Sequence, residues 1–510
     1  MLAKTYSYGI DGLDAFQVCI EVDVSRGLPA TIIVGLPDNA IKESKERVRS
    51  AIKNSGHKFS PHRITINLSP ADTKKEGPSY DLAMAVGILA ATEQIRPEHL
   101  GEYVILGELS LDGHIKPING TLSIALSVPH QKFKGLIVPS ANAAEAALAG
   151  NMAVFPLDTL NEVIHFLTCP DSIRPFQADV ARLFNVKNNF DIDFADVKGQ
   201  THAKRGLEIA AAGGHNCLLI GPPGSGKSML AKRLPTILPD MTPAESLEAT
   251  KIHSVVGLIK PGECVVTARP FRSPHHTTSD VAMVGGGSIP KPGEVTLSHH
   301  GVLFLDELPE FNRNVLEALR QPLEDHCVTI ARAIKSTCFP SKFIFICAMN
   351  PCPCGWYTDP KRECHCTPTQ IQRYLSKISG PLLDRIDIHL EVPALPAADV
   401  MSLNKAEASC DIKTRTAQAR AIQQHRFRDS AVATNAQMNH RQIKKFCGLN
   451  DECKSLLKRA IDELGLSARA YDKILKVART IADLDAEENV SAQHLAEAIQ
   501  YRYLDRNWWG

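Results

Sequence analysis

The sequence predicts an α/β protein built from several domains, on three observations. The chain has 510 residues, which exceeds the size of one ordinary hydrophobic core. Short apolar segments alternate with stretches of helical periodicity over most of its length. One apolar segment runs directly into a glycine-rich motif and then into a helix-compatible stretch, an arrangement typical of proteins with a parallel sheet.

Composition narrows the class of protein further. Hydrophobic residues make up 44% of the chain and charged residues 22%, as in globular rather than disordered or fibrous proteins. The formal net charge is only +1, so contacts to nucleic acid would depend on local basic patches. The first residues lack the apolar segment of a signal peptide, and the longest apolar run, 82–91, is about half a membrane span. We therefore expect a cytoplasmic protein without a membrane partner, whose 14 cysteines are reduced thiols or metal ligands.

Residues 1–168 are expected to form an N-terminal α/β domain. Residues 16–22 and 63–68 alternate between apolar and polar side chains, as half-buried strands do, and residues 40–54 have helical periodicity. Residues 169–193 form the predicted linker, because the periodicity fades there and prolines and polar residues accumulate.

Residues 194–396 are predicted to form a domain with a parallel sheet and crossover helices. Its apolar strands are expected at 217–220, 302–305 and 343–347. Strand signals nearly vanish after Pro396, so residues 397–510 are predicted to be helical, for example at 416–426 and 468–481.

The clearest motif is a phosphate-binding loop between the first of these strands and a helix. It fits the pattern G-x-x-x-x-G-K-[ST] and consists of Gly221, Pro222, Pro223, Gly224, Ser225, Gly226, Lys227 and Ser228. The glycines let backbone N–H groups surround phosphates, Lys227 neutralises their charge, and Ser228 can hold Mg²⁺. The motif therefore predicts a nucleotide site with magnesium.

Polar side chains follow two further strands. Asp306 and Glu307 come directly after residues 302–305, and Asn350 follows residues 343–347. Asp306 can hold the Mg²⁺ shell, Glu307 can polarise a water for attack on the γ-phosphate, and Asn350 can orient that water. Downstream of a phosphate-binding loop, these roles are favoured over the alternative that the acidic pair merely ends a strand.

In chain order, these motifs and the segment 380–387 (Gly-Pro-Leu-Leu-Asp-Arg-Ile-Asp) resemble an AAA+ ATPase of the magnesium-chelatase-like branch. The resemblance runs nearly end to end and is greatest to the YifB/ComM family of bacterial competence and recombination proteins. It implies that the phosphate-binding loop is the Walker A motif, that Asp306 and Glu307 form Walker B, and that Asn350 is sensor 1.

The resemblance also assigns two arginines and the last domain. Residues 397–510 would be the helical lid, Arg469 its sensor 2, and Arg385 an arginine finger that reaches the ATP of a neighbouring subunit. A planar cation from outside the loop suits the charge that develops on the transferred phosphoryl group. The finger implies a ring, typically a homo-hexamer. The alternative is that Arg385 only pairs with Asp384 or Asp387.

Candidate DNA contacts lie between the phosphate-binding loop and Asp306. Residues 269–276 (Arg-Pro-Phe-Arg-Ser-Pro-His-His) combine cations with an aromatic ring, and a mobile loop of this kind can follow a nucleic-acid backbone. The resemblance implies a helix-2 insert at about 254–300 and a hairpin near 329–337 with Arg332 and Lys335. A surface excursion with solvated basic residues is the alternative. The same alternative applies to basic residues of the lid: Lys413, Arg415, Arg420, Arg426, Arg428, Arg441, Lys444 and Lys445.

Four cysteines fall within fifteen residues in the pattern C-x-C-x₉-C-x-C: Cys352, Cys354, Cys364 and Cys366. Thiolates of this small loop, 352–366, can close a tetrahedral Zn²⁺ site that stiffens a segment too polar to form its own core. We expect structural zinc; free thiols and a redox switch are the alternatives, and His365 is a possible substitute ligand. Because the loop follows Asn350, we expect it near the ATP site or the pore.

Two segments of the N-terminal domain resemble the Lon protease domain, which has a ribosomal S5 domain 2-like fold. Residues 75–81 resemble its serine motif, with Ser79 as the serine, and residues 107–120 resemble the segment that carries its catalytic lysine. Leu122 stands where the lysine should fall, and Lys116 lies six residues earlier. A serine–lysine dyad needs a neutral amine as base, so we expect a scaffold or DNA-binding collar without proteolysis. The N-terminal domain also has a basic helix-like stretch, which can touch DNA or be a solvated face. Its basic residues are Lys42, Lys45, Arg47, Arg49 and Lys53.

Together these features predict a hexameric AAA+ ATPase that couples ATP hydrolysis to movement along DNA and to branch migration, a helicase activity used when DNA is integrated during natural transformation. The DNA task follows from the resemblance. Expected cofactors are ATP, Mg²⁺ and structural Zn²⁺, and expected partners are single-stranded and branched DNA, other copies of the chain, and recombinase filaments. The alternative is a magnesium-chelatase-like ATPase that remodels a protein or metallocofactor complex.

Overall fold

The computed structural model describes residues 2–504 except 97, 180–183, 185–189, 261, 288–289, 332–335, 358, 360–361, 395–405, 431 and 465–466. The chain forms two compact units. The first consists of Met1–Val186 together with Pro243–Val266, and the second of Lys187–Thr242 together with Thr267–Gly510. The predicted boundary at 396/397 and part of the predicted linker lie outside the described residues, and the domain limits stay predictions.

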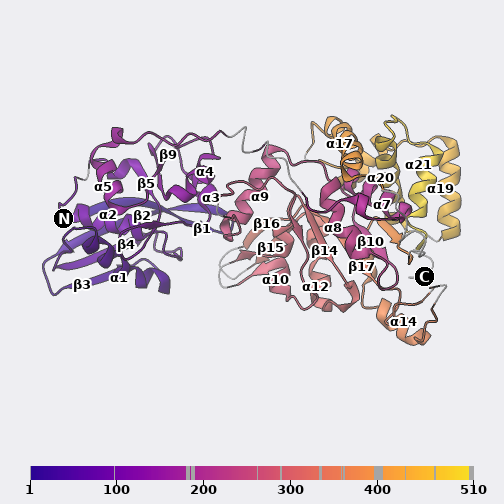
Figure 1. The fold of residues 1–510 in the computed structure, drawn as a ribbon, viewed down its shortest axis with the longest axis horizontal. Helices are drawn as coiled ribbons and strands as arrows, with labels where there is room; N and C mark the ends of the chain where they lie inside the picture. The colour runs from indigo at the N-terminus through magenta and orange to yellow at the C-terminus, as the bar shows by residue number, and fades with distance from the viewer. Residues whose placement is uncertain are drawn as a thin grey trace. The chain divides into compact units, whose positions relative to one another are not determined.

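The first unit is built on a seven-stranded mixed sheet in the order β3-β4-β2-β1-β5-β8-β9 (Figure 1). Its strands are β1 (Leu2–Asp11), β2 (Asp14–Ser25), β3 (Ala30–Val34), β4 (Arg63–Ser69), β5 (Tyr103–Ile105), β8 (Gly135–Val138) and β9 (Ala153–Pro156). β2 pairs antiparallel with β1 and with β4, and the other neighbours run parallel. The strands predicted at 16–22 and 63–68 are thus confirmed within β2 and β4.

Helices cover both faces of this sheet, because alternate residues of a strand point to opposite sides. Ile105 and Ile137 join one buried cluster with α1, α2 and α5, whereas Val104 and Leu136 join another with α3 and α4. The helices are α1 (Asn39–Asn54), α2 (Asp81–Ala91), α3 (Thr121–Ser127), α4 (Ala143–Ala147) and α5 (Leu160–Thr168). The helix predicted at 40–54 is confirmed as α1, whose first turn is capped by Asp38.

Helix α9 (Pro243–Val255) belongs to the first unit although its sequence lies between strands of the second. It packs against α3, and a buried polar cluster fixes its end. The Gly120 N–H group donates to the carbonyl and hydroxyl oxygens of Ser254, at 3.2 and 3.0 Å. The Ser254 hydroxyl donates to the Glu145 carboxylate, which also accepts the Leu122 N–H at 2.8 Å. A segment inserted between strands of the second unit in sequence therefore belongs to the first unit.

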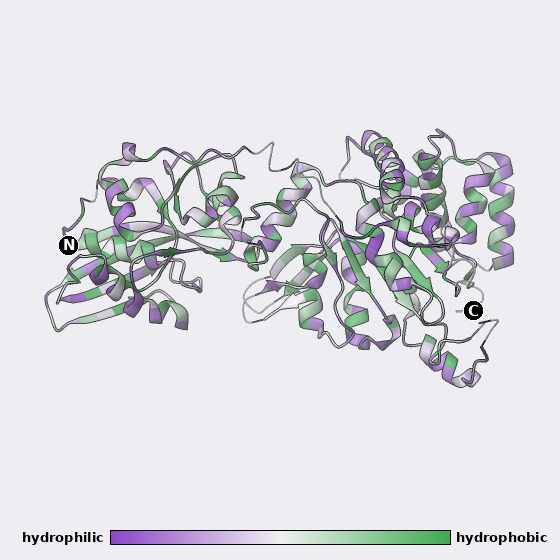
Figure 2. Ribbon diagram, in the orientation of Figure 1, coloured by the Kyte–Doolittle hydropathy of each residue, from purple (hydrophilic) through white to green (hydrophobic). Residues whose placement is uncertain are grey.

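The second unit contains a five-stranded, fully parallel sheet in the order β11-β14-β17-β10-β18. The strands are β10 (Cys217–Ile220), β11 (Phe271–Arg272), β14 (Val302–Leu305), β17 (Ile344–Met349) and β18 (Ile388–Glu391). Figure 2 shows hydrophobic residues along these strands, as expected for a sheet buried on both faces. The predicted hairpin is present as β15 (Cys327–Ala331) and β16 (Ser336–Pro340), while Arg332 and Lys335 lie outside the described residues.

The C-terminal part of the second unit is helical and shares its hydrophobic core with the sheet. Helices α7 (Thr201–Gly213) and α8 (Lys227–Ile237) flank the sheet. The later helices are α17 (Ser409–Arg426), α18 (His440–Phe446), α19 (Asp451–Leu464), α20 (Ala468–Leu484) and α21 (Ala492–Gln500). No helix in the described ranges is both long enough and apolar enough to cross a lipid bilayer.

Candidate functional site

The phosphate-binding loop connects β10 to the first turn of α8. Gly224 and Gly226 have φ angles of 77° and 93°, in the left-handed region that glycine adopts without strain. α8 begins at Lys227, so its first unpaired N–H groups face the loop. A helix N-terminus that follows such a loop is a ready anion site, as the motif predicts.

Lys227 is held inside this loop. Its Nζ donates to the carbonyl oxygens of Gly221 and Pro222, at 2.7 and 2.9 Å, and to Oδ1 of Asn350 at 3.2 Å. Burial lowers the pKa of Lys227 to about 8. Phosphate oxygens of a nucleotide would supply negative charge at this point and favour the protonated amine.

Two oxygen donors meet beside the lysine. The Ser228 hydroxyl on α8 donates to Oδ2 of Asp306, at the end of β14, at 2.5 Å. Mg²⁺ takes oxygen ligands and is usually bound by one or two protein groups plus substrate phosphates, so this pair fits the ion. Glu307 follows with a φ angle of 53°, and its Oε2 lies 3.6 Å from Nδ1 of His276, a neighbour that sequence reasoning missed.

The two predicted arginines lie at the other edge of the sheet. Parallel strands end at one edge, so the loop, Asp306, Glu307 and Asn350 gather there. β18 pairs with β10, and the pairing starts with Ile388 opposite Cys217. Just before these residues, the Asn216 side chain donates to the Arg385 carbonyl at 2.8 Å. Arg385 therefore lies where both strands begin, at the edge opposite the loop. Four strand residues, about 13 Å, separate these edges.

Arg385 and Arg469 line one cavity of about 540 Å³ at that edge. Arg385 is 15% exposed and donates to the Pro381 carbonyl at 2.6 Å and to the Glu324 carboxylate. Arg469 is 63% exposed and pairs with Asp384 at 3.1 Å. The structure thus brings the two arginines together and keeps both away from the phosphate-binding loop of the same chain.

A buried polar network fixes the backbone next to Arg385. The Asp387 carboxylate lies 3.2 Å from Nδ1 of His215 and 3.2 Å from Nζ of Lys473 on α20. The other ring nitrogen of His215 lies 2.8 Å from the Thr480 hydroxyl. Although burial opposes ionisation, Lys473 and His215 hold the pKa of Asp387 far below its usual range. Sequence reasoning missed this network, because its members are far apart along the chain.

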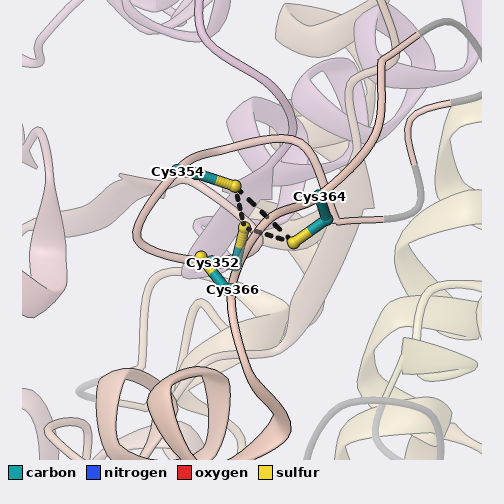
Figure 3. Close-up of side chains that lie close together, drawn as sticks. All are labelled: Cys352, Cys354, Cys364 and Cys366. Atoms are coloured by element: carbon teal, nitrogen blue, oxygen red, sulfur yellow. Dashed lines mark hydrogen bonds between the residues drawn. The ribbon is translucent and has the colours of Figure 1, made fainter.

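All four predicted cysteines come together (Figure 3). Their Sγ atoms lie within 4.8 Å of one another, and three of them are 3.3–3.6 Å apart. Burial raises the pKa of the Cys354 thiol, but backbone N–H groups and neighbouring thiols lower it further, to about 6. Four converging sulfurs with an easily formed thiolate fit a Zn²⁺ site. His365 is exposed and outside this group.

The cysteine loop packs against the phosphate-binding loop. Gly355 has a φ angle of 84°, and a Cβ there would lie 2.5 Å from Cδ of Pro223. The prediction that the cysteine loop lies near the ATP site is therefore confirmed.

Several predicted DNA-contacting cations are used inside the protein instead. Arg269 donates to the carbonyl oxygens of Pro239 and His300, at 2.6 and 2.7 Å. Arg272 makes a bidentate pair with Glu294, and it belongs to strand β11 rather than to a loop. Basic residues of the C-terminal helices are also engaged: Lys413, Arg415, Arg420 and Arg426 bind carboxylates or carbonyl oxygens of their own unit.

The Lon-like serine has no lysine partner in the part of the chain that the structure describes. Ser79 is half-buried just before α2, and Lys116 is exposed at the end of the short strand β7 (Ile115–Lys116). Leu122 is buried on α3. The absence of proteolysis from this unit stays a prediction.

The fold and the site define a P-loop protein, with Asp306 and Asn350 beside the phosphate-binding loop at one edge of a parallel sheet. Three family models match: "Magnesium chelatase, subunit ChlI" over residues 193–400, "Subunit ChlI of Mg-chelatase" over 20–142, and "Magnesium chelatase, subunit ChlI C-terminal" over 406–502. The chain is 43% identical to competence protein ComM of Haemophilus influenzae over 511 residues, covering 99% of this chain and 98% of the relative. It is 44% identical to YifB of Salmonella typhimurium with the same coverage.

The chain therefore belongs to the YifB/ComM family of magnesium-chelatase-like proteins. A shorter similarity, 27% identity over 182 residues, relates 33% of this chain to 22% of the Lon protease of Chloroflexus aurantiacus. The family supports an ATPase as the activity of the second unit.

Proposed function

We propose that the protein is a ring-forming AAA+ ATPase, in the form of a homo-hexamer, that moves along DNA and drives branch migration during integration of transforming DNA. The observation that carries the ring is the position of Arg385 and Arg469 at the sheet edge opposite the phosphate-binding loop. A single chain holds both halves of an ATP site but cannot close them on each other. A head-to-tail ring joins the loop of one subunit to the arginines of the next.

Each residue then has a defined task in hydrolysis. Lys227 and the loop N–H groups hold the phosphates, and Ser228 with Asp306 would hold Mg²⁺, which neutralises phosphate charge when bound. Glu307 accepts the proton of a water that attacks the γ-phosphate, so that ADP and inorganic phosphate are released, and Asn350 orients that water. Arg385 of a neighbouring subunit, freed from Glu324, stabilises the charge on the transferred group.

Mixed rings test the shared site. Neither Arg385→Ala nor Lys227→Ala should hydrolyse ATP alone, because each lacks one half of every site. In a mixture, the intact loop of an Arg385→Ala subunit meets the intact arginine of a Lys227→Ala subunit, so some ATPase activity should return. Mixed assembly without any recovery would refute the shared site, and equal activity per chain in dilute monomers would refute the ring.

The DNA task is supported by a full-length relative that is named a competence protein. The ATPase rate should rise when single-stranded DNA is added, and wild-type rings should convert synthetic four-way junctions to products while Glu307→Gln rings should not. An ATPase rate that DNA leaves unchanged would favour the alternative, a chelatase-like remodelling of a protein or metallocofactor complex, which the family models also accommodate.

We further propose that Cys352, Cys354, Cys364 and Cys366 hold a structural Zn²⁺ ion beside the ATP site, on the convergence of their sulfurs. Protein purified without chelator should contain about one zinc per chain by elemental analysis. A Cys352→Ser/Cys364→Ser variant should lose it, whereas Cys410→Ser, a change at an exposed cysteine outside the group, should not. Absence of zinc from the wild type would refute the site.

A further inference from the structure

One face of α1 in the first unit carries four cations. Lys42, Lys45, Arg49 and Lys53 are spaced by three, four and four residues, so they lie within about 80° of arc on the helix. All four are exposed. We call them the α1 basic stripe; it extends over about 16 Å of helix at 1.5 Å per residue.

Contacts within the protein do not account for this stripe. Lys42, Lys45 and Lys53 form no ion pair with any residue in the described ranges, although Glu43 and Glu46 lie on the same helix. Arg47, predicted with them as a DNA contact, behaves differently. Its Nε donates to the buried Asp81 carboxylate at 2.8 Å and ties α1 to α2.

The stripe also works against the stability of its own helix. Lys45 with Arg49, and Arg49 with Lys53, are like charges four residues apart, and each such pair costs an isolated helix about 0.2–0.5 kcal/mol. Arg49 lies over the Phe59 ring and Lys53 in the last turn favours the helix dipole, but these contacts do not explain Lys42 and Lys45, whereas an anionic partner explains all four cations. Among the other predicted cations, Arg269, Arg272 and four of the eight basic residues of the lid are already engaged inside their unit.

The stripe continues into a hollow of about 710 Å³ at the end of α1. Its lining includes Lys53, His57, Lys58, Phe59 and His62, with Glu93 as the acidic member. Gln94 exchanges hydrogen bonds with the backbone of Lys58, at 2.9 and 2.7 Å, and so fixes the segment before the ring of Phe59. The Arg49 guanidinium lies 5.7 Å from the centre of that ring. Proteins that bind single-stranded nucleic acid combine such cations with an aromatic ring. The cations contact the phosphates, and a base stacks on the ring.

We propose that the α1 basic stripe and this hollow bind a single strand of DNA, with its phosphates along α1 and a base in the hollow beside Phe59. The inference rests on the proposed function, because it places on the N-terminal unit a second grip on the polymer that the ATPase moves along. It also gives the N-terminal unit a task that does not need the missing lysine of a protease.

The test uses the full-length protein without nucleotide and a fluorescent thirty-residue oligothymidylate, with affinity measured by anisotropy across a series of salt concentrations. In Lys42→Gln/Lys45→Gln/Arg49→Gln/Lys53→Gln, the slope of log affinity against log salt should become shallower by about 0.7 for each phosphate that is no longer neutralised, or up to about 3. The basal ATPase rate should stay unchanged, since none of these residues touches the ATP site. Removing like charges should not weaken the helix.

Two further variants sharpen the result. Lys454→Gln/Lys458→Gln/Arg459→Gln removes three exposed cations from α19 and serves as the matched control, with an unchanged slope. Phe59→Leu should lower the affinity several-fold at every salt concentration without a change in slope, because it removes stacking but no charge.

The outcomes separate this inference from the proposed function. A wild type that binds no DNA at any salt concentration would overturn both. Wild-type binding with an unchanged slope in the α1 variant would overturn the inference alone. If the α1 variant lost more affinity for duplex DNA than for single-stranded DNA, the assignment to a single strand would be overturned.

Discussion

Replacing Asp387 by asparagine should destabilise the second unit more than any exposed substitution would. The amide would keep the shape of the side chain, but it would remove the negative charge that faces Nζ of Lys473 at 3.2 Å and Nδ1 of His215 at 3.2 Å. Lys473 is 12% exposed where it lines the cavity beside Arg385, so water can replace its partner only in part. Lys473 keeps one other acceptor, the Ile386 carbonyl at 2.9 Å.

The magnitude follows from the loss of one partner of a buried ion pair, about 3–5 kcal/mol. The remaining hydrogen bond of Lys473 places the expected loss near the lower end, about 3 kcal/mol. At about 2.1 cal/mol/K of unfolding entropy per residue, a unit of about 300 residues loses about 1.6 °C of melting temperature per kcal/mol, so the transition of the second unit should fall by about 5 °C. ATPase activity should fall as well, because Asp387 fixes the backbone two residues after Arg385, whereas ATP binding should persist.

The measurement is calorimetry of the full-length protein. It compares the melting temperature of Asp387→Asn with that of the double variant Asp387→Asn/Lys473→Met, and so separates the loss of stability from its proposed cause, the unpaired Lys473 charge. The double variant removes the stranded charge and should regain at least half of the lost stability. A decrease of less than about 2 °C, or a double variant no more stable than the single one, would show that the pair does not hold α20 to the sheet.

Three further outcomes are expected. Lys227→Ala should abolish ATP binding, whereas Glu307→Gln should bind ATP but fail to hydrolyse it; near-normal turnover in the glutamine variant, in a phosphate-release assay, would remove Glu307 from its role. Gly355→Ala should weaken ATP binding several-fold in nucleotide titrations while zinc content stays the same, because the added Cβ displaces Pro223. Ser254→Ala should cost about 1–3 kcal/mol by leaving a buried carboxylate short of a donor, and faster hydrogen exchange should appear in α3, far away in sequence; unchanged exchange there would contradict the contact.

The features that could be predicted from the sequence are those formed by residues close together along the chain. The phosphate-binding loop could be predicted because its strand, glycines and helix are contiguous, and each has its own conformational requirement. The cysteine group could be predicted for the same reason, since all four sulfurs belong to one short loop. Ser228 and Asp306 are each assigned to Mg²⁺ from their motifs, and the structure brings them together because parallel strands end at one edge of the sheet.

Long-range placement could not be predicted in this way. The position of Arg385 opposite the loop depends on the order of the strands and on where β18 begins, and neither is written in the residues around Arg385. Arg269 and Arg272 have the composition of a DNA-contacting loop, but Arg269 binds carbonyl oxygens 30 and 31 residues away, and Arg272 binds Glu294, 22 residues away. The assignment of residues 243–266 to the first unit likewise depends on contacts between Ser254 and Gly120, 134 residues apart.

That assignment has a mechanical consequence. The chain passes from one unit to the other at 186/187, returns at 242/243, and passes again at 266/267, so three chain segments connect the two units. Two bodies joined by three segments have fewer ways to separate than two bodies joined by one segment. Cutting the chain once, or deleting its first 186 residues, would not release an independent ATPase, because α9 would lose the surface that covers Ala249 and Ile252. The first unit is thus assembled from two separate stretches of the chain, one of them inserted into the sequence of the second unit.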